Sequence, residues 1–97
     1  MQITVQEIQQ IVSNVTKVSI EEINSPSRKG NVVQSRHLSM HFSRWNTKLP
    51  MQKIAKLHNR DYHATVINAD ESISYSIRKD VKLKTIYDEI QSQIKNF

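Results

Sequence analysis

Apolar residues recur at intervals of three or four through most of the chain, a pattern typical of helices with one buried face. We predict a first helix at about 4–16, opened by the capping box Thr4-Val5-Gln6-Glu7, and a very short second helix from Ser19 through Ile23. The next stretch, Ser25 to Asn31, contains a proline and the only glycine of the chain, so we expect a loop. The first two helices are expected to be scaffold.

A third helix is predicted at about 32–46, with Asn31 as its N-cap. Its inward stripe is expected to hold Val33, Leu38, Phe42 and Trp45. Its exposed side is expected to hold Arg36, His37 and Arg44.

The stretch at about 50–79 has the pattern of two helices joined by a tight turn. Met51, Ile54 and Ala55 give the first helix one inward face, and the polar run Asn59-Arg60-Asp61 interrupts the period. Asp61 is expected to accept from the free N–H groups that open the second helix. That helix is predicted to bury Val66, Ile67, Ala69, Ile73 and Ile77. A helix, a tight turn and a helix form the arrangement that places a helix N-terminus in a DNA major groove.

Helical spacing returns after Arg78-Lys79-Asp80 and predicts a last helix at about 82–96 that packs back across the bundle. Its inward residues are expected to be Leu83, Ile86, Tyr87, Ile90 and Ile94. No segment has the pattern of a strand. The predicted fold class is therefore all-α, a five- to six-helix bundle that contains a helix–turn–helix, in a single domain of residues 1–97 with one small core.

Positive charge is concentrated in the middle of the chain. The formal net charge is +5, and residues 25–60 hold no acidic residue. The basic residues of this segment are Arg28, Lys29, Arg36, Arg44, Lys48, Lys53, Lys56 and Arg60. Uncompensated positive charge of this density favours a polyphosphate partner, although a solvated basic face without a partner would show the same composition.

Several other classes of site lack the residues that they need. The chain has no cysteine, so neither a disulfide nor a thiolate zinc site is available, and its one glycine excludes a phosphate-binding loop. His37 and His41 have the spacing of two metal ligands, but Leu-Ser-Met between them offers no glutamate base. No apolar run approaches the ~18 residues of a membrane span. We therefore predict a soluble, cytoplasmic protein without catalytic residue, metal, cofactor, nucleotide site or membrane partner.

The order basic loop, long helix, short helix and then Asn-Arg-Asp-Tyr-His-Ala-Thr-Val-Ile-Asn-Ala at 59–69 resembles the C-terminal DNA-binding domain of the bacterial replication initiator DnaA. The signature of that family reads roughly Gly-Arg-Asp-His-(Ser/Thr)-Thr-Val. The resemblance runs from about Val5 to Ile77. It implies an all-α bundle built on a helix–turn–helix similar to that of Trp repressor. It also implies binding to double-stranded DNA at replication-origin-like sites, in the nucleoid of a bacterial cytoplasm.

Carried over by position, the resemblance implies that His63 and Thr65 contact the major groove and that Arg28 enters the adjacent minor groove. Arg36 matches an arginine that lies along the DNA in the family, and His37 stands where many members have a polar residue near the duplex. We expect base contacts from His63, Ala64, Thr65, Asn68 and Arg28. We expect backbone contacts from Lys29, Arg36, His37, Lys53, Arg60 and Tyr62.

The chain departs from the family pattern at several positions of the motif. Ala64 stands at the place of the first Ser or Thr, so a methyl group replaces a hydroxyl and suits the C5 methyl of thymine. An ungapped match through His63 places Tyr62 at the aspartate of the family, whereas matching Arg60 and Asp61 to its Arg-Asp makes Tyr62 an insertion. His58 and Asn59 replace the usual glycines. These departures concern the nine-base target of the family rather than DNA binding itself.

Other functions fit parts of the pattern. The amphipathic first and last helices could dock onto a partner, so the alternative is a protein-interaction or regulatory helical module of a mobile element whose basic face binds DNA only non-specifically. Binding of single strands would need exposed aromatic residues, and Phe42 and Trp45 are expected inside. Without a phosphate loop, the chain would occupy, mark or block a site, or form one domain of a longer ATPase. We expect a monomer.

Overall fold

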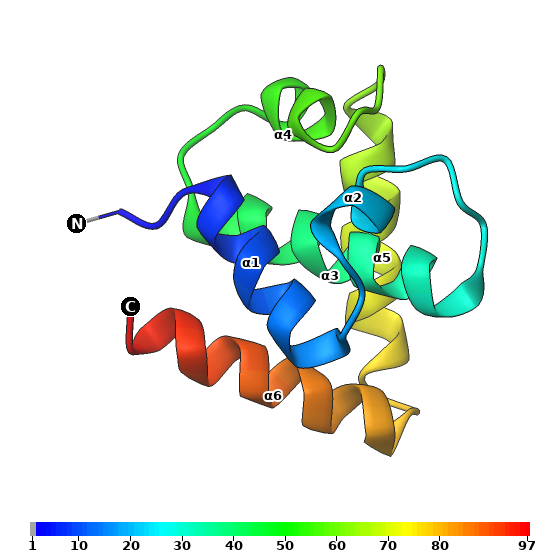
Figure 1. Cartoon of the computed structure of the whole chain (residues 1–97), viewed down its shortest axis with the longest axis vertical. Coiled ribbons are helices and arrows are strands. Elements are labelled where there is room, and N and C mark those ends of the chain that lie inside the picture. Colours follow the sequence, from blue (N-terminus) through cyan, green and yellow to red (C-terminus); the bar gives the residue numbers. More distant parts are fainter. Residues whose placement is uncertain (1) are drawn as a thin grey trace.

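The computed structural model describes residues 2–97, and these residues form six helices and no strand. The helices are α1 (Val5–Thr16), α2 (Ile20–Ile23), α3 (Gly30–Asn46), α4 (Met51–Leu57), α5 (Ala64–Ser76) and α6 (Val81–Lys95) (Figure 1). The predicted all-α class and helix–turn–helix order are confirmed. No helix of residues 2–97 combines the length and the apolar character needed to cross a bilayer.

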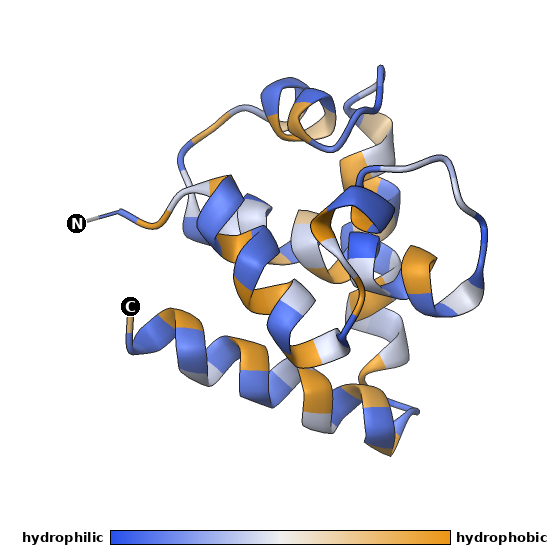
Figure 2. Ribbon diagram, in the orientation of Figure 1, coloured by the Kyte–Doolittle hydropathy of each residue, from blue (hydrophilic) through white to orange (hydrophobic). Residues whose placement is uncertain are grey.

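Helix α3 is the central element of the fold. It packs against α1, α2, α4 and α5, while α6 packs against α1 (Figure 1). In Figure 2, apolar segments of α1 and α6 face each other across this contact. Because α3 has neighbours on several sides, it also buries polar residues, among them Ser35, Ser39 and Ser43. Its inward face is therefore wider than a single apolar stripe.

Three helices begin at side-chain caps. The capping box of α1 is confirmed, because the Thr4 hydroxyl accepts from the Glu7 N–H at 3.1 Å and Glu7 Oε1 accepts from the Thr4 N–H at 2.8 Å. Ser19 caps α2 in the predicted place, and Asp80 caps α6 by accepting from the Leu83 N–H at 3.1 Å. These contacts span three residues, so local sequence is sufficient to form them.

Two predicted caps are wrong. Helix α3 begins at Gly30, with Lys29 as its N-cap, so Asn31 lies inside the first turn. Helix α5 begins at Ala64 with His63 as its N-cap, so Asp61 does not cap it. Neither helix has a side-chain cap hydrogen bond. In α5 the N–H groups of Thr65 and Val66 donate instead to main-chain carbonyls, those of Tyr62 and His63, each at 3.0 Å.

The buried apolar residues form two clusters, whereas the sequence predicts one small core. The larger cluster joins α1, α3 and α6 and includes Ile8, Leu38 and Ile90. The smaller cluster joins α3, α4 and α5 through Met40, Ile54, Ala55, Val66 and Ala69, with Val5 of α1. Most of the predicted inward residues of α4 and α5 are buried, while Met51, Ile67 and Ile77 are partly exposed. The smaller cluster holds α4 against α5 and so sets the geometry of the helix–turn–helix.

The predicted orientation of α3 is wrong at two large side chains. Trp45 is expected inside but is 64% exposed, and Arg36 is expected outside but is only 6% exposed. The indole N–H of Trp45 donates to Asp70 of α5 at 2.8 Å, which holds the ring at the surface. Val32 rather than Val33 fills the core. Hydrogen-bond partners from distant segments decide these orientations. The hydrophobic period of α3 gives no information about such partners.

Candidate nucleic-acid interface

The turn between α4 and α5 is held by one glutamine of α4. Gln52 donates its amide N–H to the main-chain carbonyl of Asp61 at 2.7 Å, and its amide oxygen accepts from the main-chain N–H of His63 at 3.2 Å. Asn59 has φ 59°, a left-handed conformation that asparagine adopts more easily than most residues. The turn therefore has a defined conformation before α5 begins.

The first turn of α5 presents its polar side to solvent. His63, Ala64 and Asn68 are exposed and Thr65 is partly exposed, while Val66 and its neighbours along the inner face are buried. The start of α5 has no side-chain cap, and the N–H groups of Thr65 and Val66 donate to the main-chain carbonyls of Tyr62 and His63, each at 3.0 Å. Its positive dipole end therefore lies at the surface, beside the exposed side chains of His63 and Ala64. The surface suits a phosphate oxygen or a base edge.

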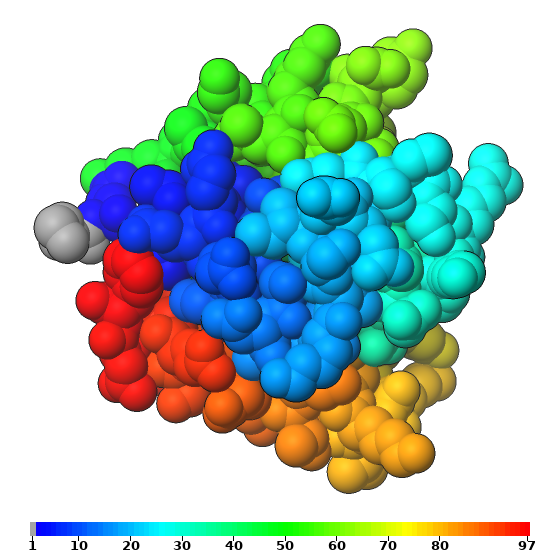
Figure 3. All heavy atoms as spheres, in the orientation of Figure 1, coloured from blue at the N-terminus to red at the C-terminus, as the bar shows by residue number. Residues whose placement is uncertain are grey.

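The basic loop lies on the same side of the molecule as this turn. Arg28 and Lys29 are exposed in the loop between α2 and α3. In Figure 3 the α2–α3 loop and the segment that leads into α5 form two projections on one side of the surface. Figure 1 shows both away from α6 and from the C-terminus. The two segments are thus placed to meet one extended partner together.

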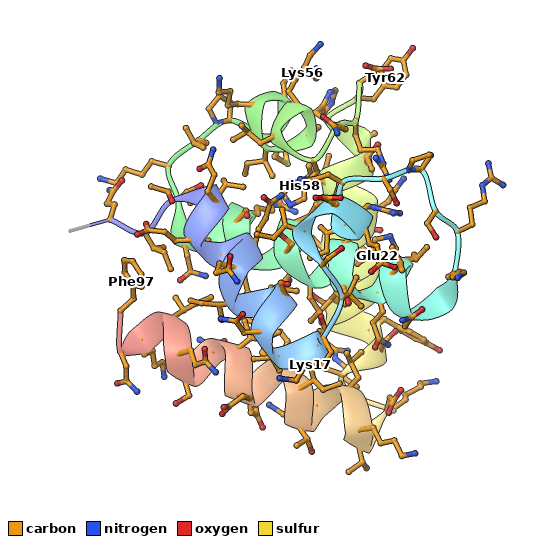
Figure 4. All side chains as sticks on the ribbon, viewed as in Figure 1. Lys17, Glu22, Lys56, His58, Tyr62 and Phe97 are labelled. Atoms are coloured by element: carbon orange, nitrogen blue, oxygen red, sulfur yellow. The ribbon has the colours of Figure 1, made fainter. Side chains whose placement is uncertain are left out.

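Further exposed residues lie near the turn. Tyr62 is 74% exposed, and Lys53 and Lys56 are exposed on α4. In Figure 4, Lys56 and Tyr62 project from the same end of the molecule. Lys56 is absent from the contacts predicted above, although it belongs to the basic run. Its spacing three residues after Lys53 is the signal that could have found it, because residues three apart share a helix face.

Two arginines that the sequence assigns to phosphate contacts turn toward the main chain. Arg36 donates through Nε to the carbonyl of Ile23 at 2.7 Å, and through Nη2 to Ser25 at 2.8 Å and Ser27 at 3.0 Å. Arg60 donates through Nη2 to the same Ser25 carbonyl at 2.7 Å. Burial and then the charge of Arg60 lower the pKa of Arg36. Both side chains are therefore part of the support beneath the basic loop.

Two histidines near these arginines are held neutral. His58 is fully buried, with Nε2 2.7 Å from the Ser39 hydroxyl and Nδ1 2.9 Å from the carbonyl of Ile54. Burial and the neighbouring charges of Arg60 and Arg36 lower the pKa of His58 to about 4. The pKa of the partly buried His37 is lowered by burial and then by the same two arginines. The His37 ring can thus donate or accept a hydrogen bond, but it adds no charge at neutral pH.

The histidine pair on α3 does not form a metal site. His41 has Nδ1 2.6 Å from Asp70 Oδ1 and Nε2 2.8 Å from the hydroxyl of Tyr87, so both ring nitrogens have partners. Within residues 2–97 no three His, Cys, Asp or Glu side chains are arranged to hold a metal ion. The imidazole belongs to a polar cluster between α3, α5 and α6.

A family model described as the bacterial DnaA protein helix-turn-helix matches residues 5–73. The match begins at the first residue of α1 and ends within α5. It therefore includes the basic loop, the α4–α5 turn and the exposed first turn of α5.

Proposed function

Because the chain belongs to the family of bacterial DnaA helix-turn-helix domains, which bind DNA, we propose that it binds double-stranded DNA sequence-specifically. The first turn of α5 enters the major groove, and the α2–α3 loop reaches the neighbouring minor groove. The observation that carries this proposal is the joint placement of the loop and the exposed first turn of α5, which lie on one side of the molecule. An Arg in a narrow minor groove and a helix N-terminus in the adjacent major groove must lie on a common side of the protein.

Each exposed residue of the surface has a proposed role. On α5, the side chains of His63, Thr65 and Asn68 contact base edges by hydrogen bonds, and the methyl group of Ala64 contacts a thymine methyl. Arg28 enters the minor groove. Lys29, Lys53, Lys56 and Tyr62 contact phosphates, and His37 donates a hydrogen bond to the backbone. The base contacts determine the sequence, and the phosphate contacts fix the register.

The proposed target is a replication-origin-like site in a bacterial nucleoid, bound by a monomer. Ala64 and Tyr62 alter the outward surface of the helix start relative to the family signature, so the preferred bases are expected to differ at the positions that these residues face. Bound at such a site, the chain would mark it or block access to it.

Selection of bound duplexes from a random pool tests this function. The expected result is one enriched motif with two parts, a major-groove segment read by α5 and an adjacent A·T-rich segment read by Arg28. The double variant H63A/T65A is the control, and it should still bind DNA and enrich the A·T-rich segment, but lose the major-groove segment of the motif. Retention without enrichment by the parent chain would instead support the alternative, a helical module whose basic face binds DNA non-specifically.

A further inference from the structure

Two guanidinium groups from different elements end on one main-chain oxygen. Arg36 of α3 and Arg60 of the helix–turn–helix turn donate to the carbonyl of Ser25 at 2.8 Å and 2.7 Å. A carbonyl oxygen has two lone pairs and can accept both bonds. Ser25 and Arg60 lie 35 residues apart in the chain. The contact therefore joins the basic loop to the turn before α5.

Neighbouring bonds support the same junction. The Asn59 side-chain amide donates to the carbonyl of Asn24 at 3.1 Å, and Gln9 of α1 donates to the Asn24 side chain at 2.9 Å. Arg60 also donates to the carbonyls of His58 and Asn59, at 3.0 Å and 3.2 Å, so its fork connects both sides of the junction. The start of the loop is thus tied to three other parts of the fold.

The charges of the two arginines make this junction selective for one loop conformation. Arg36 is 6% exposed, and neither Arg36 nor Arg60 is paired with a carboxylate within residues 2–97. A buried cation without such a partner is costly unless other acceptors surround it. Here the acceptors are the carbonyls of Ile23, Ser25 and Ser27. The loop must therefore turn these carbonyls inward, which fixes the path of the chain up to Arg28.

We propose that Arg36 and Arg60 are positioning residues for DNA recognition. Together with the Ser25 carbonyl they form a clamp, named here the Ser25 clamp, that sets the distance between the basic loop and the first turn of α5. The inference rests on the proposed function, because it states how the two DNA-contacting segments are held in register. With the loop already ordered, binding avoids the entropy cost of ordering it, and Arg28 and α5 bind as one unit.

The variant R60K distinguishes a positioning role of Arg60 from a simple contact between its charge and a phosphate. Lysine keeps the positive charge, but its compact ammonium cannot reproduce the planar fork that joins several carbonyls. Arg36→Ala would leave buried carbonyls without donors and is expected to destabilise the whole fold, so Arg60 carries the test. Arg78→Lys is the matched control, since Arg78 is exposed in the turn after α5.

The first measurement needs no DNA. In the free full-length chain, backbone ¹⁵N relaxation should show Ser27, Arg28 and Lys29 as ordered as the helices. R60K should lower their order parameters while leaving those of α1 and α6 unchanged, and Arg78→Lys should change neither. Asn59→Gly, which keeps the left-handed backbone and removes the bond to Asn24, should have a smaller effect. Loop order equal to that of the parent in R60K would overturn the clamp.

The second measurement is a double-mutant cycle on the selected duplex. We expect R60K to weaken binding about 10-fold, and Arg28→Ala to cost about 10-fold in the parent but only about 3-fold in R60K, because a loosened loop no longer places Arg28. Equal cost in both backgrounds would overturn the positioning role. Failure of the parent to select any duplex would overturn the proposed function, and with it the role of the clamp in recognition. The relaxation data would then still report whether the clamp orders the loop.

Discussion

Two buried polar clusters of this fold differ in whether their charges are neutralised inside the protein. Around Asp70 of α5, the carboxylate accepts from His41 at 2.6 Å, Arg44 at 2.7 Å and Trp45 at 2.8 Å, so negative charge meets donors inside the protein. Around Ser25, two arginines meet only carbonyl oxygens. The first cluster is internally neutralised, and the second keeps an excess of positive charge beneath the exposed basic loop.

The two clusters differ in whether their charge is balanced within the protein: that of the Asp70 cluster is, and that of the Ser25 cluster is not. The pKa of His41 is lowered because burial outweighs the attraction of Asp70, so its Nδ1–H donates to Asp70 while Nε2 accepts from the Tyr87 hydroxyl. This cluster joins α3, α5 and α6 and gains nothing from an external ion. The arginine cluster, in contrast, holds two like charges together, and a phosphate backbone close to the loop would lower their repulsion.

The largest effect is expected from breaking the neutralised cluster. Asp70→Ala would leave Arg44 without its counter-ion and three donors without an acceptor, so the free energy of unfolding should fall by about 3–5 kcal/mol. Urea denaturation would measure this loss. Asp88→Ala is the control, because Asp88 forms an exposed pair with Lys84, at 2.7 Å, and should cost less than about 0.5 kcal/mol. A similar cost for both variants would show that the Asp70 cluster is dispensable.

A fall in pH should destabilise the arginine cluster around Ser25 through protonation of His58. Its pKa is about 4 in the folded protein and 6.5 without perturbation, so the unfolded chain binds the proton more readily. Stability is therefore complete above pH 6.5 and falls as the pH drops toward 4, by about 3 kcal/mol. A protonated His58 would add a third cation beside Arg36 and Arg60. Chemical denaturation at several pH values measures this slope.

The variant His58→Gln isolates the contribution of this imidazole. It should flatten the pH dependence of stability between 6.5 and 4, while His37 and His41, whose pKa values burial also lowers, continue to contribute. A pH profile identical to that of the parent would contradict the assignment.

Discrimination between DNA sequences should depend on α5 more than on the loop. His63→Ala should reduce the preference for the selected duplex over a scrambled one by about 1–3 kcal/mol, since a base contact is lost. Arg28→Ala should weaken binding to most sequences, with a smaller change in preference. Titrations of both variants on both duplexes would measure this. Equal losses from His63→Ala on the two duplexes would place the recognition surface elsewhere.

The smallest expected effect is a change in salt dependence. With roughly five phosphates neutralised, log K should fall with log salt at a slope of about −4.5, and Lys53→Ala should reduce the slope by about 0.9. Lys82→Ala, on the exposed start of α6, should leave it unchanged. A slope near zero for the parent would contradict the electrostatic part of the proposal.

The candidate surface was partly predictable from the pattern of residues. The outward positions His63, Ala64 and Asn68 followed from the helical period of α5, because Val66, Ala69 and Ile73 on its other face enter the two cores. Arg36 and Arg60 were predicted as surface cations, since sequence alone does not contain the carbonyls that bind them. The DNA contacts of all these residues stay predictions.

By itself, the sequence determined the six helices, most of their ends and the helix–turn–helix order, because periodicity and caps such as Thr4 with Glu7 act over three or four residues. Only the tertiary structure decided that Trp45 lies outside, that Arg36 lies inside and that the loop is tied to the turn before α5. The physical reason is the partner: a buried polar group needs a donor or acceptor, and here that group comes from a distant part of the chain.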